Sequence, residues 1–286
     1  MSIIERRITG TPEGLLARPA AGGRAGVLVL HGSYGPGTEE RCRLLANAGL
    51  VAFGMRWYGG AGQPPGICEV PIESIGRGLD LLAAEGVERL GVLGLSKGAE
   101  AALWLSVLDP RTAAVVALSP AAVTWPNLGP GTDGRSRPVR SSWTWQGEPL
   151  PFAPLDETWE PVARQDGLVS LRGRYESSRD RYPEAYRAAA IPVERSAARF
   201  VLVAGADDLT WPSLASARAL TARRQAAGLP TDLITHDAAG HRPRFPGESP
   251  ATASTHLAYG GTDAADASLG AAAWPHVLDA LTGPRR

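Results

Sequence analysis

The hydrophobic residues of the chain form two alternating patterns. Short, mainly apolar runs, typical of strands buried on both faces of a sheet, occupy residues 27–30, 51–55, 90–95, 113–118, 200–204 and 232–235. Apolar residues at helical spacing or in alanine- and leucine-rich stretches occupy residues 39–48, 72–83, 99–107, 214–227 and 267–281. This alternation predicts an α/β fold, with a mostly parallel central sheet and helices on both faces.

Two details at the ends of the chain complete this prediction. Residues 3–8 and 15–16 are expected to add edge strands to the sheet. Pro275 lies within the last helical segment, and because proline lacks the backbone N–H, we expect it to kink or divide that helix.

Residues 123–198 interrupt the alternation. They are rich in proline, glycine and arginine, show no clear strand, and contain four of the eight tryptophans, namely Trp125, Trp143, Trp145 and Trp159. Because a disordered linker should be poor in aromatic residues, we expect an ordered, lid-like insertion within one domain spanning residues 1–286. Such an insertion over the carboxyl edge of the sheet would place at least one of these tryptophans in a substrate pocket. The alternative is that they pack on the sheet without contacting substrate.

Composition excludes several classes of protein. The 29 basic residues balance the 29 acidic ones, which argues against a nucleic-acid-binding protein. Two cysteines, Cys42 and Cys68, are too few for a disulfide framework or a four-cysteine zinc site. No phosphate-loop, dinucleotide or histidine–carboxylate zinc motif appears, so we expect neither a cofactor nor a metal. Without a signal-peptide core or an apolar run of about 18 residues, the chain is expected to be cytoplasmic and not membrane-bound.

One motif predicts nucleophilic catalysis. The sequence Gly94-Leu95-Ser96-Lys97-Gly98 joins an expected strand to an expected helix. A sharp turn there needs glycines, because a Cβ would collide with the neighbouring strand and helix. The turn presents the serine hydroxyl at the helix start, where backbone N–H groups favour a developing anion. This context predicts the nucleophile elbow of an α/β-hydrolase fold, with Ser96 as the nucleophile. The alternative is a tight turn whose serine has no catalytic role.

The partners of Ser96 are predicted from the strand ends that follow it. His241 lies in a loop just after the strand at residues 232–235, the usual position of the hydrolase base. Asp207 and Asp208 both follow the strand at residues 200–204, and a Gly-x-x-Asp spacing favours Asp208 as the acid, with Asp207 as the alternative.

An oxyanion hole needs two further N–H donors. Lys97, the residue after the nucleophile, supplies one backbone N–H, and Ser33 or Tyr34, after the first buried strand, supplies the other.

The string Ser96-Lys97-Gly98-Ala99-Glu100, which holds the only lysine of the chain, resembles the nucleophile motif of a known family. That family comprises the C-terminal domains of acyl-CoA thioesterases and bile-acid-CoA:amino-acid N-acyltransferases. The resemblance covers roughly residues 25–282 and includes the segments at residues 56–60, 205–213 and 240–261. It implies Ser96 as nucleophile, Asp208 as acid and His241 as base. In this family serine accompanies hydrolysis and cysteine accompanies transfer to an amine, so the resemblance implies a thioesterase for a small-molecule acyl thioester or ester.

Two other functions remain open from the sequence. An acyltransferase would use the same acyl-enzyme but admit an amine or alcohol in place of water. A non-catalytic binding module with a hydrolase fold is disfavoured by the complete set of serine, aspartate and histidine. Several arginines occur close together, and these could bind the phosphates of coenzyme A or form a solvated surface. They are Arg135, Arg137, Arg140, Arg172, Arg174, Arg242 and Arg244.

Overall fold

The computed structural model describes residues 2–35 and 37–283. A central sheet of eight strands has the order β1-β2-β4-β3-β6-β7-β10-β11. The strands are β1 (Ile3–Ile8), β2 (Glu13–Pro19), β3 (Ala25–Leu30), β4 (Val51–Arg56), β6 (Arg89–Leu95), β7 (Thr112–Leu118), β10 (Arg199–Gly205) and β11 (Thr231–His236). The strands β1 and β2 pair antiparallel with their neighbours, whereas all other pairs in this sheet are parallel. The predicted mostly parallel α/β sheet is therefore confirmed.

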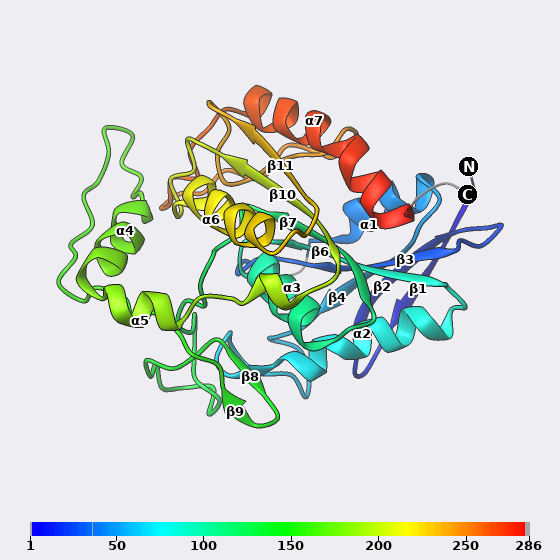
Figure 1. Cartoon of the computed structure of the whole chain (residues 1–286), viewed down its shortest axis with the longest axis horizontal. Helices are drawn as coiled ribbons and strands as arrows, with labels where there is room; N and C mark the ends of the chain where they lie inside the picture. Colours follow the sequence, from blue (N-terminus) through cyan, green and yellow to red (C-terminus); the bar gives the residue numbers. More distant parts are fainter. Residues whose placement is uncertain (1, 36, 284–286) are drawn as a thin grey trace.

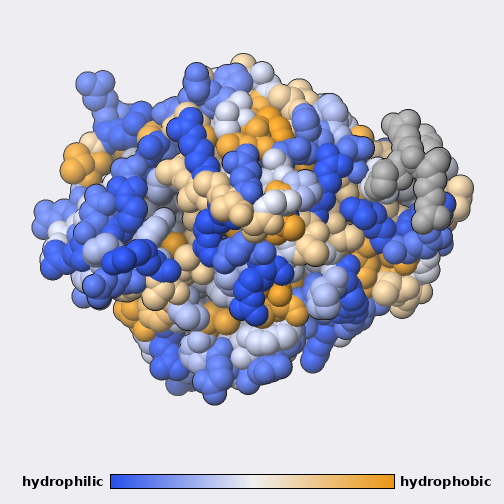
Figure 2. All heavy atoms as spheres, viewed as in Figure 1, coloured by the Kyte–Doolittle hydropathy of each residue, from blue (hydrophilic) through white to orange (hydrophobic). Residues whose placement is uncertain are grey.

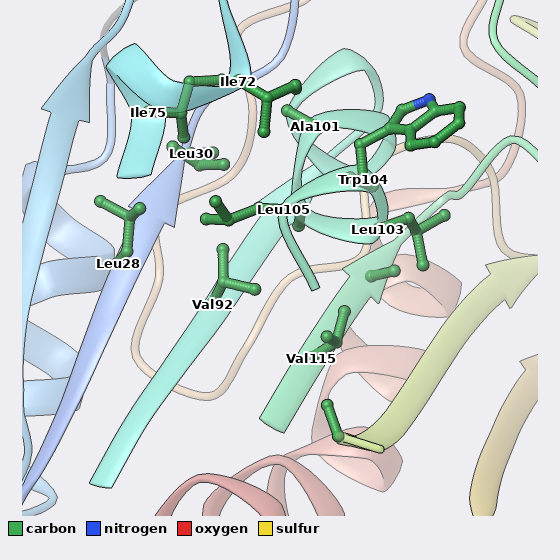
Figure 3. Packing of buried hydrophobic residues seen from close by; sticks show 14 of the residues in the cluster. Leu28, Leu30, Ile72, Ile75, Val92, Ala101, Leu103, Trp104, Leu105 and Val115 are labelled. Carbon is green, nitrogen blue, oxygen red and sulfur yellow. The ribbon is translucent and has the colours of Figure 1, made fainter. Parts of the chain in front are cut away.

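Helices cover both faces of this sheet (Figure 1). One face is covered by α1 (Glu39–Asn47) and α7 (Asp263–Thr282), and the other by α2 (Ile72–Ala84), α3 (Lys97–Leu108) and α6 (Ser213–Ala226). The close view in Figure 3 shows side chains of β3, β6 and β7 meeting those of α2 and α3. Both faces are thus closed to water, which is the arrangement of an α/β-hydrolase fold.

The two-sided burial explains the continuous apolar runs. In β3, Leu28 and Leu30 belong to the core beneath α2 and α3, whereas Val27 and Val29 belong to the core beneath α1 and α7. All four side chains are at most 1% exposed. Because successive side chains of a strand point to opposite faces, a strand covered on both sides must be apolar at every position.

We expected Pro275 to kink or divide the last helix. Division is wrong, because α7 continues from Asp263 to Thr282, whereas a kink stays a prediction. The missing N–H of Pro275 leaves the carbonyl of Ala271 without its intrahelical partner, and both residues are exposed, so water can satisfy that carbonyl. Leu269 and Val277, on the opposite side of the helix, are fully buried against the sheet. Burial of this side stabilises the helix across the proline.

Residues 123–198 contain several short elements. These are β8 (Trp143–Trp145), β9 (Glu148–Pro149), α4 (Arg172–Arg181), α5 (Pro183–Ala188) and a 3-10 helix at Val193–Arg195. The strand β8 pairs with β5 (Val70–Pro71) and β9 in a second, three-stranded sheet, so the expectation of no strand here is wrong. Two- and three-residue strands are too short to show a periodic pattern.

The insertion lies to one side of the main sheet. Figure 1 shows it in green at the left and lower left of the molecule. In the same view, mainly hydrophilic residues cover the surface around α4 (Figure 2). The insertion therefore adds to the side of the molecule and presents a polar surface there.

The strand register brings the catalytic candidates to one edge of the sheet. Leu30, the last residue of β3, pairs with Gly94 of β6, and Leu95 of β6 pairs with Leu118, the last residue of β7. The loops that follow β3, β6 and β7 therefore begin side by side. In open α/β sheets, ligands bind at the carboxyl ends of the strands.

Candidate active site

Ser96 occupies a strained turn between β6 and α3. Its backbone has φ of 57° and ψ of −121°, a conformation that L-residues with a side chain rarely adopt. A Cβ on Gly94 would lie 2.1 Å from the Gly98 carbonyl oxygen, and a Cβ on Gly98 would lie 2.5 Å from the His31 carbonyl oxygen. The structure thus gives the physical reason for both glycines, since any side chain there would force the strand and helix apart.

The acid and base candidates are hydrogen-bonded to each other. His241 Nδ1 lies 2.8 Å from Asp208 Oδ2, and both side chains are almost fully buried. The other carboxylate oxygen, Asp208 Oδ1, accepts the backbone N–H groups of Thr210 and Trp211 at 2.9 and 3.2 Å. These bonds fix the carboxylate and orient the imidazole.

The backbone of His241 is held as well. Its N–H donates to the Tyr259 carbonyl at 2.9 Å, and its own carbonyl accepts the Ser119 hydroxyl at 2.9 Å. Its neighbour Gly240 donates its N–H to Asp266 Oδ1 at 2.7 Å. Burial raises the pKa of Asp266 to about 6, against the lowering effect of the Gly240 N–H. Sequence reasoning missed Asp266, because it lies in the first turn of α7 and carries no motif.

Asp207, the alternative acid, is placed differently. Its side chain is exposed, and Oδ2 accepts the Gly261 N–H at 2.8 Å. The structure therefore brings His241 together with Asp208 and gives Asp207 a contact with the loop before α7.

Ser96 and His241 open into one cleft of about 630 Å³. Ser33 and Tyr34 line the same cleft, on the loop after β3. No hydrogen bond joins Ser96 Oγ to the His241 imidazole, although both residues lie in the described part of the chain. Catalytic hydrogen bonds often tighten only when substrate binds, so the absence of this bond is compatible with a base that approaches Ser96 in the complex.

The far wall of the cleft comes from the segment between β11 and α7. Residues 241–244 and 248–255, together with Tyr259, line it. Sequence reasoning missed this wall beyond His241 and its flanking arginines. The signal was the length of the connection, since a long stretch without regular structure inside a domain is usually functional or disordered.

Three arginines of the cleft differ in their partners. Arg41 forms an ion pair with Glu248, and Arg244 forms one with Asp263 at 2.9 Å. Arg242 donates to the neutral carbonyl of Thr252, and its guanidinium lies 3.5 Å from the centre of the Tyr259 ring. The other candidate arginines, at positions 135, 137, 140, 172 and 174, do not line this cleft.

None of the four candidate tryptophans lines the cleft either. Trp125 and Trp143 are at most 3% exposed and pack within hydrophobic clusters. Trp145 lies partly buried beside the larger core, and Trp159 lies near Gly173 of α4. The structure thus gives Trp125 and Trp143 packing roles, and a contact of any of the four with substrate stays a prediction.

The described residues show neither a cluster of metal-binding side chains nor a helix that could span a membrane. Within residues 2–35 and 37–283, no group of three or more histidine, cysteine, aspartate or glutamate side chains could hold a metal ion. No helix in that part of the chain is both long and apolar enough to cross a bilayer.

Residues 81–282 match the sequence profile described as "BAAT / Acyl-CoA thioester hydrolase C terminal". The chain belongs to this family. The resemblance seen in the sequence is therefore confirmed, and the matched region includes Ser96, Asp208 and His241. Two mouse proteins are similar in sequence. The chain is 28% identical over 261 residues to mitochondrial acyl-coenzyme A thioesterase 2, and 27% identical over 282 residues to acyl-coenzyme A thioesterase 1.

These alignments cover 90% and 97% of the chain but only 52% and 61% of the two mouse proteins. The chain therefore spans between half and two thirds of the length of these relatives. Among solved structures, a putative dienelactone hydrolase from Klebsiella pneumoniae superposes with a TM-score of 0.56 at 15% identity, covering 99% of this chain and all of that one. At that identity the likeness concerns the fold, and it confirms the α/β-hydrolase architecture.

Proposed function

We propose that this protein is a serine hydrolase that cleaves an acyl thioester, of the acyl-CoA kind, or an ester through an acyl-enzyme on Ser96. The observation that carries the proposal is the Asp208–His241 hydrogen bond at the cleft into which the Ser96 elbow opens. Family membership and the acyl-coenzyme A thioesterases among the relatives favour a thioester over other acyl compounds.

In the first half-reaction, Ser96 Oγ attacks the acyl carbonyl carbon while His241 Nε2 takes the hydroxyl proton. Asp208 holds Nδ1 protonated, so Nε2 is the free base. The carbonyl oxygen gains the negative charge and is stabilised by the Lys97 N–H and an N–H of Ser33 or Tyr34. When the carbon–sulfur bond breaks, the thiolate leaves with the proton of His241, and Ser96 carries the acyl group as an ester.

In the second half-reaction, His241 removes a proton from water, and the hydroxide oxygen attacks the ester carbonyl. The bond to Ser96 Oγ breaks, Ser96 recovers its proton from His241, and the carboxylic acid leaves. Water can reach the ester because the cleft is open to solvent along its wall, where Ala251 and Thr252 are exposed.

Among the cleft residues that the structure describes, Arg242 is the cation that suits a leaving group with phosphates. Arg41 and Arg244 are already paired with carboxylates, whereas Arg242 donates to a carbonyl oxygen. A guanidinium with N–H groups to spare binds phosphate oxygens with charge-assisted hydrogen bonds. Arg242 is thus the residue that would favour coenzyme A over an uncharged thiol.

The test uses an active-site probe and intact mass. A fluorophosphonate should add one adduct to the wild type and none to Ser96→Ala, while Ser74→Ala, which removes a hydroxyl from the surface of α2, should label like the wild type. Mass spectrometry after mixing with acyl-CoAs and aryl esters should show one acyl adduct and release of free acid. Undiminished labelling of Ser96→Ala would refute the proposal. Release of an amide in the presence of amines, instead of free acid, would identify an acyltransferase.

A further inference from the structure

The loop after β3 is held by aromatic side chains at three successive carbonyl groups. Trp57 Nε1 donates to the His31 carbonyl at 3.3 Å, His31 Nδ1 donates to the Gly32 carbonyl at 2.7 Å, and Tyr58 Oη donates to the Ser33 carbonyl at 2.5 Å. This loop carries the two candidate oxyanion donors, Ser33 and Tyr34. Three consecutive carbonyl groups of this loop therefore accept hydrogen bonds from side chains.

The three donor rings stabilise one another. The His31 ring stacks on Trp57 with centroids 5.2 Å apart, and Trp57 meets the Tyr58 ring edge-on at 4.7 Å. Burial lowers the pKa of His31 to about 4, so the ring is neutral at pH 7. Its bond to a carbonyl oxygen requires the proton on Nδ1. The cluster of His31, Trp57 and Tyr58 is thus a rigid support with a defined pattern of donors.

A side chain that fixes a carbonyl group also fixes the direction of the N–H group in the same peptide. In a trans peptide the carbonyl and the next N–H point in opposite directions, and the cis bond among the described residues is at Thr11–Pro12, away from this loop. Tyr58 does not line the cleft, whereas Ser33 and Tyr34 do. Because the Ser33 carbonyl points toward Tyr58, the Tyr34 N–H points away from Tyr58.

The loop is also close enough to the nucleophile to act on its substrate. A Cβ on Gly32 would lie 3.3 Å from the Ser96 Cβ and 3.9 Å from the Ser96 Oγ. The acyl oxygen of a substrate attacked by Ser96 must therefore lie beside this loop, where N–H groups held in advance are most effective.

We propose that Tyr58 is a positioning residue for the oxyanion hole: its hydroxyl holds the Ser33 carbonyl away from the cleft and so fixes the N–H groups that bind the acyl oxygen in the transition state. His31 does the same for the preceding peptide. This inference rests on the proposed hydrolase function, because it assigns a role in the reaction of Ser96.

The decisive variant is Tyr58→Phe, which removes the hydroxyl and keeps the ring that packs on Trp57 and His31. Loss of one oxyanion donor itself costs about 10²- to 10³-fold in kcat, and misplacing a donor should cost less, about 10- to 100-fold. We expect kcat to fall by that factor with KM within about twofold, and binding of a trifluoromethyl ketone, which forms a tetrahedral adduct on serine, to weaken in parallel. The matched control is Tyr182→Phe, at the junction of α4 and α5, which should change neither.

A second pair of variants tests His31. His31→Asn keeps a hydrogen-bond donor near the position of Nδ1 and should retain most of kcat. His31→Leu lacks this donor, so its kcat should fall. The inference is overturned if Tyr58→Phe keeps wild-type kcat and ketone affinity, or if it lowers only the melting temperature. Failure of the hydrolase proposal is distinguishable, because then the wild type itself would form no Ser96 adduct.

Discussion

Two adjacent residues, Asp207 and Asp208, have different roles because one side chain is exposed and the other is buried. Asp208 is 1% exposed and its carboxylate receives three N–H groups, including that of His241 Nδ1. Asp207 is exposed and receives the Gly261 N–H. The Gly-x-x-Asp spacing pointed to Asp208, but both residues follow the same strand. Two of the partners that distinguish them, His241 for Asp208 and Gly261 for Asp207, lie 33 and 54 positions away in the chain, where no local pattern could reveal them.

The corresponding prediction compares Asp208→Asn with Asp207→Asn. An asparagine at position 208 can donate to Nδ1 and would hold His241 in the tautomer whose Nε2 is protonated and cannot act as a base. Such a change costs about 10⁴-fold in kcat in a serine protease, and we expect a loss of that order here. Asp207→Asn should stay within about threefold of wild type. Turnover of one chromogenic ester measures both, and the reverse ranking would transfer the role to Asp207.

Among the helices, α3 is tied to residues 123–198 by an ion pair in its first turn. Lys97 Nζ lies 3.1 Å from both carboxylate oxygens of Glu100, and both side chains are at most 1% exposed. The ammonium also donates to the Trp125 carbonyl and to Ser142 Oγ, while the carboxylate accepts the indole N–H of Trp143 at 2.7 Å. Burial lowers the pKa of Lys97 and raises that of Glu100, each against the influence of its partner.

A double-mutant cycle on Lys97→Met and Glu100→Gln tests this link. Removing one partner leaves a buried charge uncompensated, so each single variant should lose about 3–5 kcal/mol of unfolding free energy. The double variant should regain part of that loss, because no isolated charge remains. Urea unfolding, followed by tryptophan fluorescence, measures the unfolding free energy of the two single variants and the double variant. Simple additivity of the two losses would show that the pair does not act as a unit.

At the scale of the whole molecule, the sequence predicted the sheet better than it predicted the cleft. A strand such as β3 is buried on both faces and must be apolar throughout, so its sequence alone predicts that it lies in the interior of the sheet. The cleft depends on which distant segments lie over Ser96. Tryptophan content drew attention to residues 123–198, yet residues 248–255, which have no regular structure, line the cleft. Packing between distant parts of the chain determines which segment lines the cleft, and amino-acid composition does not predict that packing.

We expect acyl specificity to reside in the wall of the cleft that contains Ala251. Ala251 lines the cleft and is exposed, so Ala251→Trp should narrow the cleft without disturbing the core. We expect kcat/KM for long acyl chains to fall at least tenfold relative to short ones, with an unchanged melting temperature, because a ring of that size excludes the longer chain.

Trp143 is fully buried, so Trp143→Ala should lose about 3–5 kcal/mol of stability and leave the ranking of acyl substrates unchanged. The matched pair decides between two locations for the acyl pocket. A changed ranking in Trp143→Ala, or in Trp145→Ala or Trp159→Ala at preserved stability, together with no change in Ala251→Trp, would place acyl recognition in the insertion after all.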